Sequence, residues 1–179
     1  MQGEFLSLIG PNGAGKTTML RAITGVVSPQ TADIDLAGRS IAGLPVHKRA
    51  RLGLAMTNQI VRPFPSMTME DNVALAAGHR RIATVFGAAM AMGRTAERKK
   101  AGELLDMLGI GEYAGQAVLG QPLGVLKRLE VARALALDPK LLLLDEPLAG
   151  LNHVEATRMA DVVVEINRNG LTVVMIEHN

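Results

Sequence analysis

Short apolar runs alternate with amphipathic segments along most of this chain. Apolar runs of strand length occur at residues 5–9, 52–57, 141–144 and 171–176. Uninterrupted runs such as 5–9 are typical of strands buried on both faces of a parallel sheet. Residues 32–38 instead alternate apolar and polar side chains, which predicts a half-exposed strand.

Helical patterns lie between these predicted strands. Helices are expected at residues 17–24, 44–51, 68–75, 95–108, 125–137 and 153–168. Gly25 is a predicted C-cap, Thr68 a predicted N-cap, and Asn169-Gly170 a predicted stop signal. Strands that alternate with helices predict an α/β fold, with a parallel sheet and functional residues at the carboxyl ends of its strands.

The helix at 125–137 is expected to bury one face, which carries Val125 and Leu129, and to place Lys127 elsewhere. The last strand, 171–176, is also a candidate exposed edge strand.

The segment from residue 60 to about 130 differs from the rest of the chain. Prolines at 63 and 65 interrupt regular structure, and helical patterns follow them, so a mainly helical insertion is expected. Residues 82–93 are rich in alanine and methionine. They fit either a docking surface for a transmembrane partner or a packed helix within the insertion.

A glycine-rich loop follows the first predicted strand and precedes the first predicted helix. Gly10 to Thr17 have the spacing of a P-loop, G-x-x-x-x-G-K-[ST]. The loop amides and the helix N-terminus form a nest for phosphate, which Lys16 would complete, while the Thr17 hydroxyl would hold Mg²⁺. A chance glycine-rich turn is the alternative. The predicted nucleotide-binding residues are Asn12, Gly13, Ala14, Gly15, Lys16, Thr17 and Thr18.

The predicted strand at 141–144 runs directly into Asp145 and Glu146. An apolar strand with acidic residues at its tip allows Asp145 to bind magnesium and Glu146 to polarise an attacking water. A solvated acidic turn is the alternative for this pair. Gln59 and His178 also follow strands, although such residues usually belong to a loop or have a structural role.

Composition limits the function further. Aromatic residues make up 2% of the chain and the formal net charge is +2, which disfavours nucleic acid as a partner. The chain has no cysteine, which fits a cytoplasmic protein. No signal peptide is visible and residues 82–93 are too short to cross a bilayer, so membrane association is expected through a partner.

Together these motifs resemble the ATP-binding subunits of ABC transporters. The likeness covers the P-loop (8–18), the Q-loop (57–59), the Walker B motif (144–147), the D-loop (149–152) and the switch-histidine segment (176–178). It implies a P-loop NTPase core with helices on both faces of the sheet. That core would comprise residues 1–60 and 131–179, with a helical subdomain and the signature segment at 61–130.

The same resemblance assigns roles to individual residues. Glu146 would be the general base, and His178 would hold the γ-phosphate. Gln59 would contact Mg²⁺ or the attacking water, beside Thr17 and Asp145 as metal ligands. Two ATPase subunits, identical or different, would enclose ATP and drive transmembrane permease subunits from the inner face of the cell membrane.

Finer motifs resemble the branched-chain amino acid importer group. Residues 62–65, 69–73, 127–135 and 145–152 carry this likeness. The ATPases of urea and amide importers are similar, so these substrates are alternatives.

The chain departs from the family at the signature segment, usually Leu-Ser-Gly-Gly-Gln. Here it is Gln121-Pro122-Leu123-Gly124-Val125, in which only Gly124 is kept as a predicted nucleotide contact. The N- and C-terminal parts of the usual domain are also expected to be absent. Two alternatives therefore stand beside the importer ATPase: a nucleotide-binding module without efficient turnover, and an ABC ATPase of a non-transport system.

Overall fold

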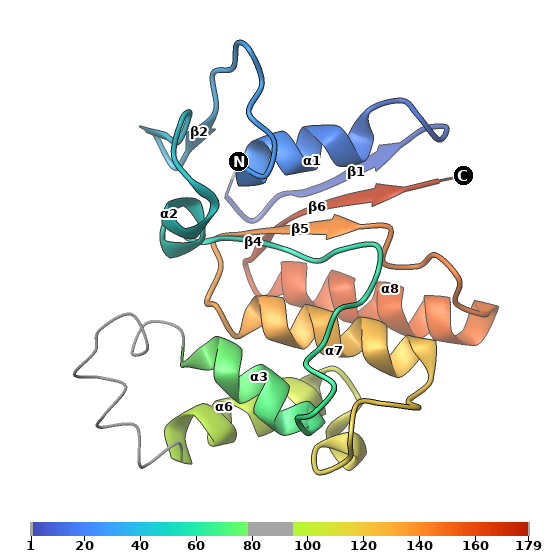
Figure 1. The fold of residues 1–179 in the computed structure, drawn as a ribbon. Helices are drawn as coiled ribbons and strands as arrows, with labels where there is room; N and C mark the ends of the chain where they lie inside the picture. Colours follow the sequence, from blue (N-terminus) through green and yellow to red (C-terminus); the bar gives the residue numbers. More distant parts are fainter. Residues whose placement is uncertain (1, 79–94, 179) are drawn as a thin grey trace.

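A parallel sheet forms the centre of the fold, and its strands lie in the order β1-β6-β5-β4 (Figure 1). The computed structural model describes residues 2–78 and 95–178. The strands are β1 (Phe5–Ile9), β4 (Leu54–Met56), β5 (Leu141–Asp145) and β6 (Thr172–Glu177). Their pairing is parallel throughout. The four predicted strands of this sheet and the α/β class are confirmed.

Two expectations about the sheet are wrong. β6 lies between β1 and β5 and is therefore not an edge strand. β1 is at the edge, and its Leu6 and Ile9 side chains are exposed rather than buried on both faces. An apolar run predicts that a strand forms, but strand order depends on the crossovers between strands, which hydrophobic pattern does not encode.

Helices cover both faces of this sheet (Figure 1). On one face, Leu20 of α1 (Lys16–Thr24) packs with Leu143 and Ile176. On the other face, α7 (Leu123–Leu135) and α8 (His153–Arg168) pack against Leu142 and Leu144. Successive residues of β5 thus face opposite layers, as the two-residue period of a strand requires.

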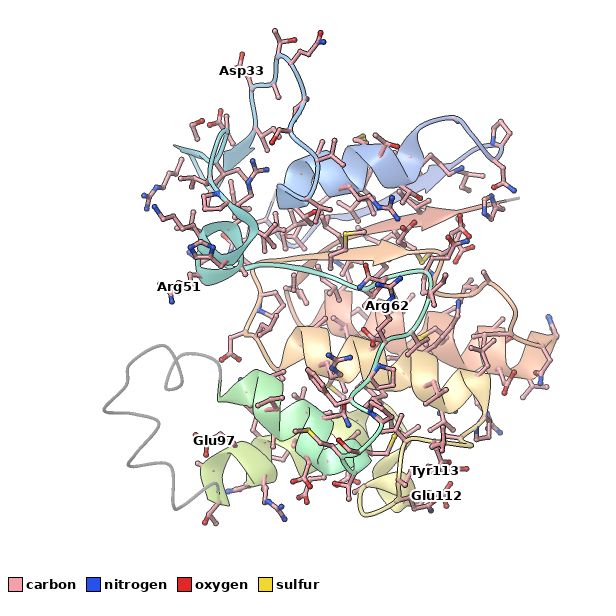
Figure 2. The ribbon with its side chains drawn as sticks, viewed as in Figure 1. Asp33, Arg51, Arg62, Glu97, Glu112 and Tyr113 are labelled. Atoms are coloured by element: carbon pink, nitrogen blue, oxygen red, sulfur yellow. The ribbon has the colours of Figure 1, made fainter. Side chains whose placement is uncertain are left out.

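Further helices lie on the side of α7 away from the sheet (Figure 1). They are α3 (Met69–Ala77), α6 (Thr95–Met107) and the 3-10 helix η1 (Gly111–Tyr113). Figure 2 places Tyr113 and Glu112 in this part of the molecule. The predicted cap is confirmed, because the Thr68 hydroxyl accepts a hydrogen bond from the Asp71 amide at 3.1 Å. The predicted docking segment at 82–93 lies outside the described residues.

The half-exposed strand predicted at 32–38 is much shorter than expected. It reduces to β2 (Asp35–Leu36), paired with β3 (Arg39–Ser40). Ala37 and Gly38 both have positive φ, as a tight hairpin turn requires, so the chain reverses before the strand can extend.

The end of α1 is held by a buried arginine. Gly25 caps the helix as predicted, with φ 82°. Arg49 of α2 (Val46–Arg51) donates to the Ala22 and Ile23 carbonyls at 2.8 and 2.7 Å. These bonds supply donors to carbonyl groups of the last helical turn, where the regular i+4 amides are missing, and the Ala22 carbonyl also accepts from the Gly25 amide at 3.1 Å. Across residues 2–78 and 95–178, no helix is long and apolar enough to span a membrane.

Candidate nucleotide-binding site

The carboxyl ends of the parallel strands bring the predicted residues to one edge of the sheet. The P-loop follows β1, Asp145 and Glu146 stand at the end of β5, and His178 follows β6. Gln59 follows β4 after two intervening residues. This shared placement is what the alternation of strands and helices predicts.

The P-loop has the backbone needed to surround an anion. Gly13 and Gly15 have φ of 81° and 87°, and an added Cβ at either would meet nothing within 4 Å. The requirement for glycine is therefore one of backbone conformation rather than of space. Gly15 is the N-cap of α1 and provides no side-chain cap, so the first helical amides are available to a ligand.

Lys16 is folded back over the loop. Its Nζ donates to the carbonyl oxygens of Gly10 at 2.5 Å and Pro11 at 3.0 Å. These carbonyls hold the ammonium beside the cavity that the loop encloses, where a phosphate group would meet it.

A cavity of about 160 Å³ occupies the centre of this edge. It is lined by Asn12, Gly13, Ala14, Gly15, Lys16, Thr17, Thr18, Glu146 and His178. The structure thus brings every predicted P-loop residue together with two of the predicted catalytic residues. Gly124 and Gln59 are not part of this lining.

Thr17, which lines the cavity, is hydrogen-bonded to Asp145, which lies just outside the lining. The Thr17 hydroxyl donates to Asp145 Oδ1 at 3.1 Å, and Asp145 is almost fully buried. Burial raises the pKa of Asp145, an effect that the Thr17 hydrogen bond opposes and the nearby Glu146 charge reinforces. A hydroxyl and a carboxylate oxygen are ligands that Mg²⁺ prefers, so this pair fits the ion.

Both carboxylate oxygens of Glu146 are engaged by predicted site residues. Gln59 Nε2 donates to Oε2 at 2.6 Å, and His178 Nε2 lies 2.5 Å from Oε1. Although outside the cavity lining, Gln59 therefore touches the carboxylate that lines it. Glu146 is buried and has φ 51°, an uncommon value for a side-chain-bearing residue that is typical of functional turns.

The segment that carries Gln59 is anchored on α7. Figure 2 labels Arg62, which lies between β4 and α3. Its amide donates to Glu130 Oε1 at 3.1 Å, and its carbonyl accepts from Arg133 Nη1 at 3.0 Å. Glu130 and Arg133 also pair with each other at 2.6 Å. A movement of α7 would therefore reach Gln59 through this cluster.

Lys127 is a residue whose position the sequence did not predict. It is buried in α7, and its Nζ donates to the Glu146 carbonyl oxygen at 2.8 Å. The available signal was the ring of apolar residues around it, because Val125, Leu129 and Val131 are all buried. With apolar side chains on several sides of the helix, the lysine has no solvent-facing stripe to occupy.

The signature segment lies apart from the cavity, at the start of α7. Pro122 is the N-cap and makes no side-chain hydrogen bond to the helix. Gly124 is buried inside the first turn, where an added Cβ would lie 2.8 Å from Glu155 Oε1. The helix begins at Leu123, two residues earlier than predicted, so Gly124 belongs to the helix rather than preceding it.

A glycine nest at a helix start, a lysine and a buried Asp-Glu pair at the tip of a second strand of the same sheet define a P-loop nucleotide-binding protein. The ABC transporter family model matches residues 1–149. The chain belongs to the ABC transporter family.

Curated relatives agree with this assignment over nearly the whole chain. The high-affinity branched-chain amino acid transport ATP-binding protein LivG of Salmonella typhimurium is 37% identical, with 98% of this chain and 71% of the relative covered. The protein of the same description from Pseudomonas aeruginosa, BraF, is 38% identical over the same shares. The lipopolysaccharide export system ATP-binding protein LptB of Haemophilus influenzae is 34% identical, covering 98% and 69%.

Solved structures give the same fold. A dimeric ATP-binding cassette in a post-hydrolysis state with ADP and Pi matches with a TM-score of 0.85 and 26% identity, covering 100% of this chain and 76% of the other. An ABC transporter cassette in its ADP conformation matches with a TM-score of 0.83 and 25% identity, covering 99% and 71%. The predicted ABC ATPase fold and the resemblance to branched-chain amino acid transport ATP-binding subunits are confirmed.

Proposed function

We propose that this protein binds and hydrolyses ATP as the energy-coupling subunit of a branched-chain amino acid importer. The observation that carries the ATPase assignment is the hydrogen bond from Thr17 to the buried Asp145, next to Glu146, which lines the P-loop cavity. Support for the substrate class comes from LivG and BraF, which are described as branched-chain amino acid transport proteins.

The P-loop side chains would bind and orient the triphosphate. The amides at the start of α1 and the Lys16 ammonium face the cavity and would bind the β- and γ-phosphates. Thr17 and Asp145 would hold Mg²⁺, with Gln59 nearby, and the ion would neutralise charge on the phosphate oxygens.

Glu146 would then act as general base toward the attacking water. Its carboxylate is held between Gln59 and His178, which restricts its orientation before the substrate arrives. His178 lines the cavity and would also contact the γ-phosphate. The three residues form one hydrogen-bonded unit, so their substitutions are expected to be non-additive.

Function also requires partners. We place a second ATPase subunit, identical or different, against the P-loop edge, with Gly124 at the start of α7 facing the partner's nucleotide. The helical subdomain, residues 61–130, would connect the core segments 1–60 and 131–179 to transmembrane permease subunits at the inner face of the cell membrane. One neighbouring cassette has been solved as a dimer in two structures, which supports this arrangement.

One alternative keeps a specific observation in its favour. Pro122 and Val125 supply no polar side chain at the start of α7, which favours a nucleotide-binding module without efficient turnover. The importer ATPase and this module differ in steady-state hydrolysis, which a single substitution separates.

The test is Glu146→Gln, with Glu103→Gln on the exposed surface of α6 as control. Steady-state ATP hydrolysis should fall by at least about 100-fold in Glu146→Gln, because it loses the base, and should be unchanged in the control. Sedimentation with Mg-ATP should show a nucleotide-loaded Glu146→Gln dimer. Wild-type protein that binds ATP without hydrolysing it, even with its permease, would support the inactive module instead.

The substrate class needs a separate measurement. Permease subunits that co-purify with the protein would be reconstituted with it in proteoliposomes, together with their substrate-binding component. ATP-dependent uptake of radiolabelled leucine is the expected result. Uptake of urea or an amide in its place would contradict the branched-chain assignment and leave the ATPase assignment intact.

A further inference from the structure

A buried lysine joins the helix of the signature segment to the backbone of Glu146. Lys127 is 6% exposed and lies in α7, one helical turn after Leu123. Its Nζ donates to the Glu146 carbonyl oxygen at 2.8 Å. The contact is with the main chain of the residue whose carboxylate lines the cavity, and not with that carboxylate itself.

The Glu146 carbonyl belongs to a tightly held turn. Glu146 has φ 51°, its amide donates to the Ile176 carbonyl at 3.0 Å, and its own carbonyl accepts from Ala149 at 3.2 Å. Leu148 is held in turn by Glu177 Oε1 at 2.9 Å. Ile176 and Glu177 belong to β6, so β6 holds this turn from one side. Lys127 holds it from α7.

A lysine at this place carries an energetic penalty that an apolar residue would avoid. Burial lowers the pKa of Lys127, and the negative charges of Glu177 and Glu146 oppose that shift. A methionine of similar length would fill the space between apolar neighbours without desolvating a charge. Packing alone therefore does not account for the lysine.

We propose that Lys127 is a positioning residue: it holds the Glu146 peptide in its left-handed conformation and so aims the Glu146 carboxylate into the P-loop cavity. The proposal rests on the proposed role of Glu146 as general base. Losing the bond would let the peptide rotate, which displaces the carboxylate from Gln59, His178 and the position of the attacking water. A displacement of about 1 Å at a reacting group can lower a rate by about 100-fold.

The same bond gives α7 a direct influence on catalysis. Leu123 and Lys127 are separated by about 6 Å along the helix axis, since each residue rises 1.5 Å. Any shift of the helix start, where the partner's nucleotide would bind, therefore reaches the Glu146 carbonyl along a rigid element. Closure of the start of α7 over the partner's nucleotide would then change the position of Glu146 on the same chain.

The test compares Lys127→Met, Lys127→Arg and Lys127→Gln with a surface control, Lys99→Met. Lys99 is exposed and pairs loosely with Glu103, with 3.9 Å between Nζ and Oε1. For each variant we would measure kcat and KM for ATP, the dissociation constant of Mg-ATP and the urea midpoint. Lys127→Met should lower kcat about 10- to 100-fold and change the dissociation constant by less than about threefold. Lys127→Arg, which keeps a cationic donor, should recover most of kcat.

A structural role would give a different result. In that case Lys127→Met would lower the urea midpoint while kcat per folded molecule stayed at the wild-type value, which would overturn the proposal. If Lys127→Met does not fold, Lys127→Gln and Lys127→Arg decide between the same outcomes. Lys99→Met should match the wild type in every measurement.

A double mutant separates this inference from the proposed function. Single-turnover hydrolysis would be measured for Glu146→Gln with and without Lys127→Met. If Lys127 acts through Glu146, adding Lys127→Met should change the residual rate less than about twofold. If Lys127→Met lowers the single-turnover rate as much in the Glu146→Gln background as in the wild type, the positioning role is overturned. If Glu146→Gln alone keeps the wild-type rate, Glu146 is not the base.

Discussion

The P-loop edge and the start of α7 are the two surfaces that would enclose a nucleotide, and they are built differently. At the P-loop edge, charged and polar side chains bond to each other before any ligand arrives, as in the Thr17–Asp145 and Gln59–Glu146 pairs. At the start of α7, Pro122 gives no side-chain cap. The exposed Leu123 and the buried Gly124 and Val125 contribute only backbone polar groups.

This difference shows where side-chain chemistry is needed and where backbone is enough. The P-loop edge must hold a metal ion and a base in defined positions, which only side chains provide. The start of α7 needs only to face an anion, and the free amides and dipole of a first helical turn can do this. Substitutions at the two surfaces should therefore have effects of different size and direction.

The largest effect is expected for Lys16→Ala. The variant removes the cation that the Gly10 and Pro11 carbonyls hold beside the cavity. Mg-ATP affinity should fall by at least about 100-fold, since charge-assisted contacts to phosphate are worth several kcal/mol. Titration with a fluorescent ATP analogue measures it, and exposed Lys48→Ala in α2 is the control. A loss smaller than threefold would mean that backbone alone binds phosphate at both surfaces.

How far the sequence predicts these features depends on how local they are. The P-loop and the Asp145–Glu146 pair were predictable because a strand, a turn and the chemistry lie within a few consecutive residues. The central position of β6 was not, because strand order is set by crossovers that skip along the chain. The burial of Lys127 was also not predicted, because its partner is a carbonyl group 19 residues away.

A smaller effect is expected for Asp145→Asn. The amide oxygen can still accept from Thr17, so this hydrogen bond is kept while the negative charge is removed. Mg²⁺-dependent hydrolysis should fall about 10- to 100-fold, because the ion loses a carboxylate ligand. A magnesium titration of hydrolysis measures it, with exposed Asp106→Asn as control. An unchanged magnesium midpoint would contradict Asp145 as a metal ligand.

At the start of α7, a change should increase activity instead. Pro122→Ser adds a hydroxyl at the N-cap, which is exposed and has no side-chain donor in the native chain. The serine should stabilise α7 by about 1 kcal/mol as a cap. If backbone amides already bind the partner's phosphate, the serine hydroxyl adds only one more hydrogen bond. Steady-state hydrolysis should then rise only about three- to tenfold. A rise above about 100-fold would show that the native segment closes poorly over ATP.

The smallest effect concerns the stability of the nucleotide-free protein. Burial raises the pKa of Asp145, so between its ordinary value near 4 and the raised value the folded state binds more protons than the unfolded state. The free energy of unfolding must therefore fall as pH rises through that window, and the loss is complete above it. The side chain introduced by Asp145→Asn does not titrate. The variant's free energy of unfolding should therefore exceed that of the wild type by almost nothing at pH 3.5 and by a growing amount toward pH 7.

Urea denaturation of both proteins at a series of pH values measures this difference without nucleotide. At neutral pH, Asp145→Asn should also show the higher Tm of the two proteins. Pro122→Ser, which introduces no titrating group, should shift stability by the same amount at every pH. An Asp145→Asn advantage that grows as pH falls would reverse the sign and contradict a raised pKa. The expected pattern would show that the buried Asp145 charge at the P-loop edge destabilises the nucleotide-free protein. No such pH-dependent cost would be found at the start of α7.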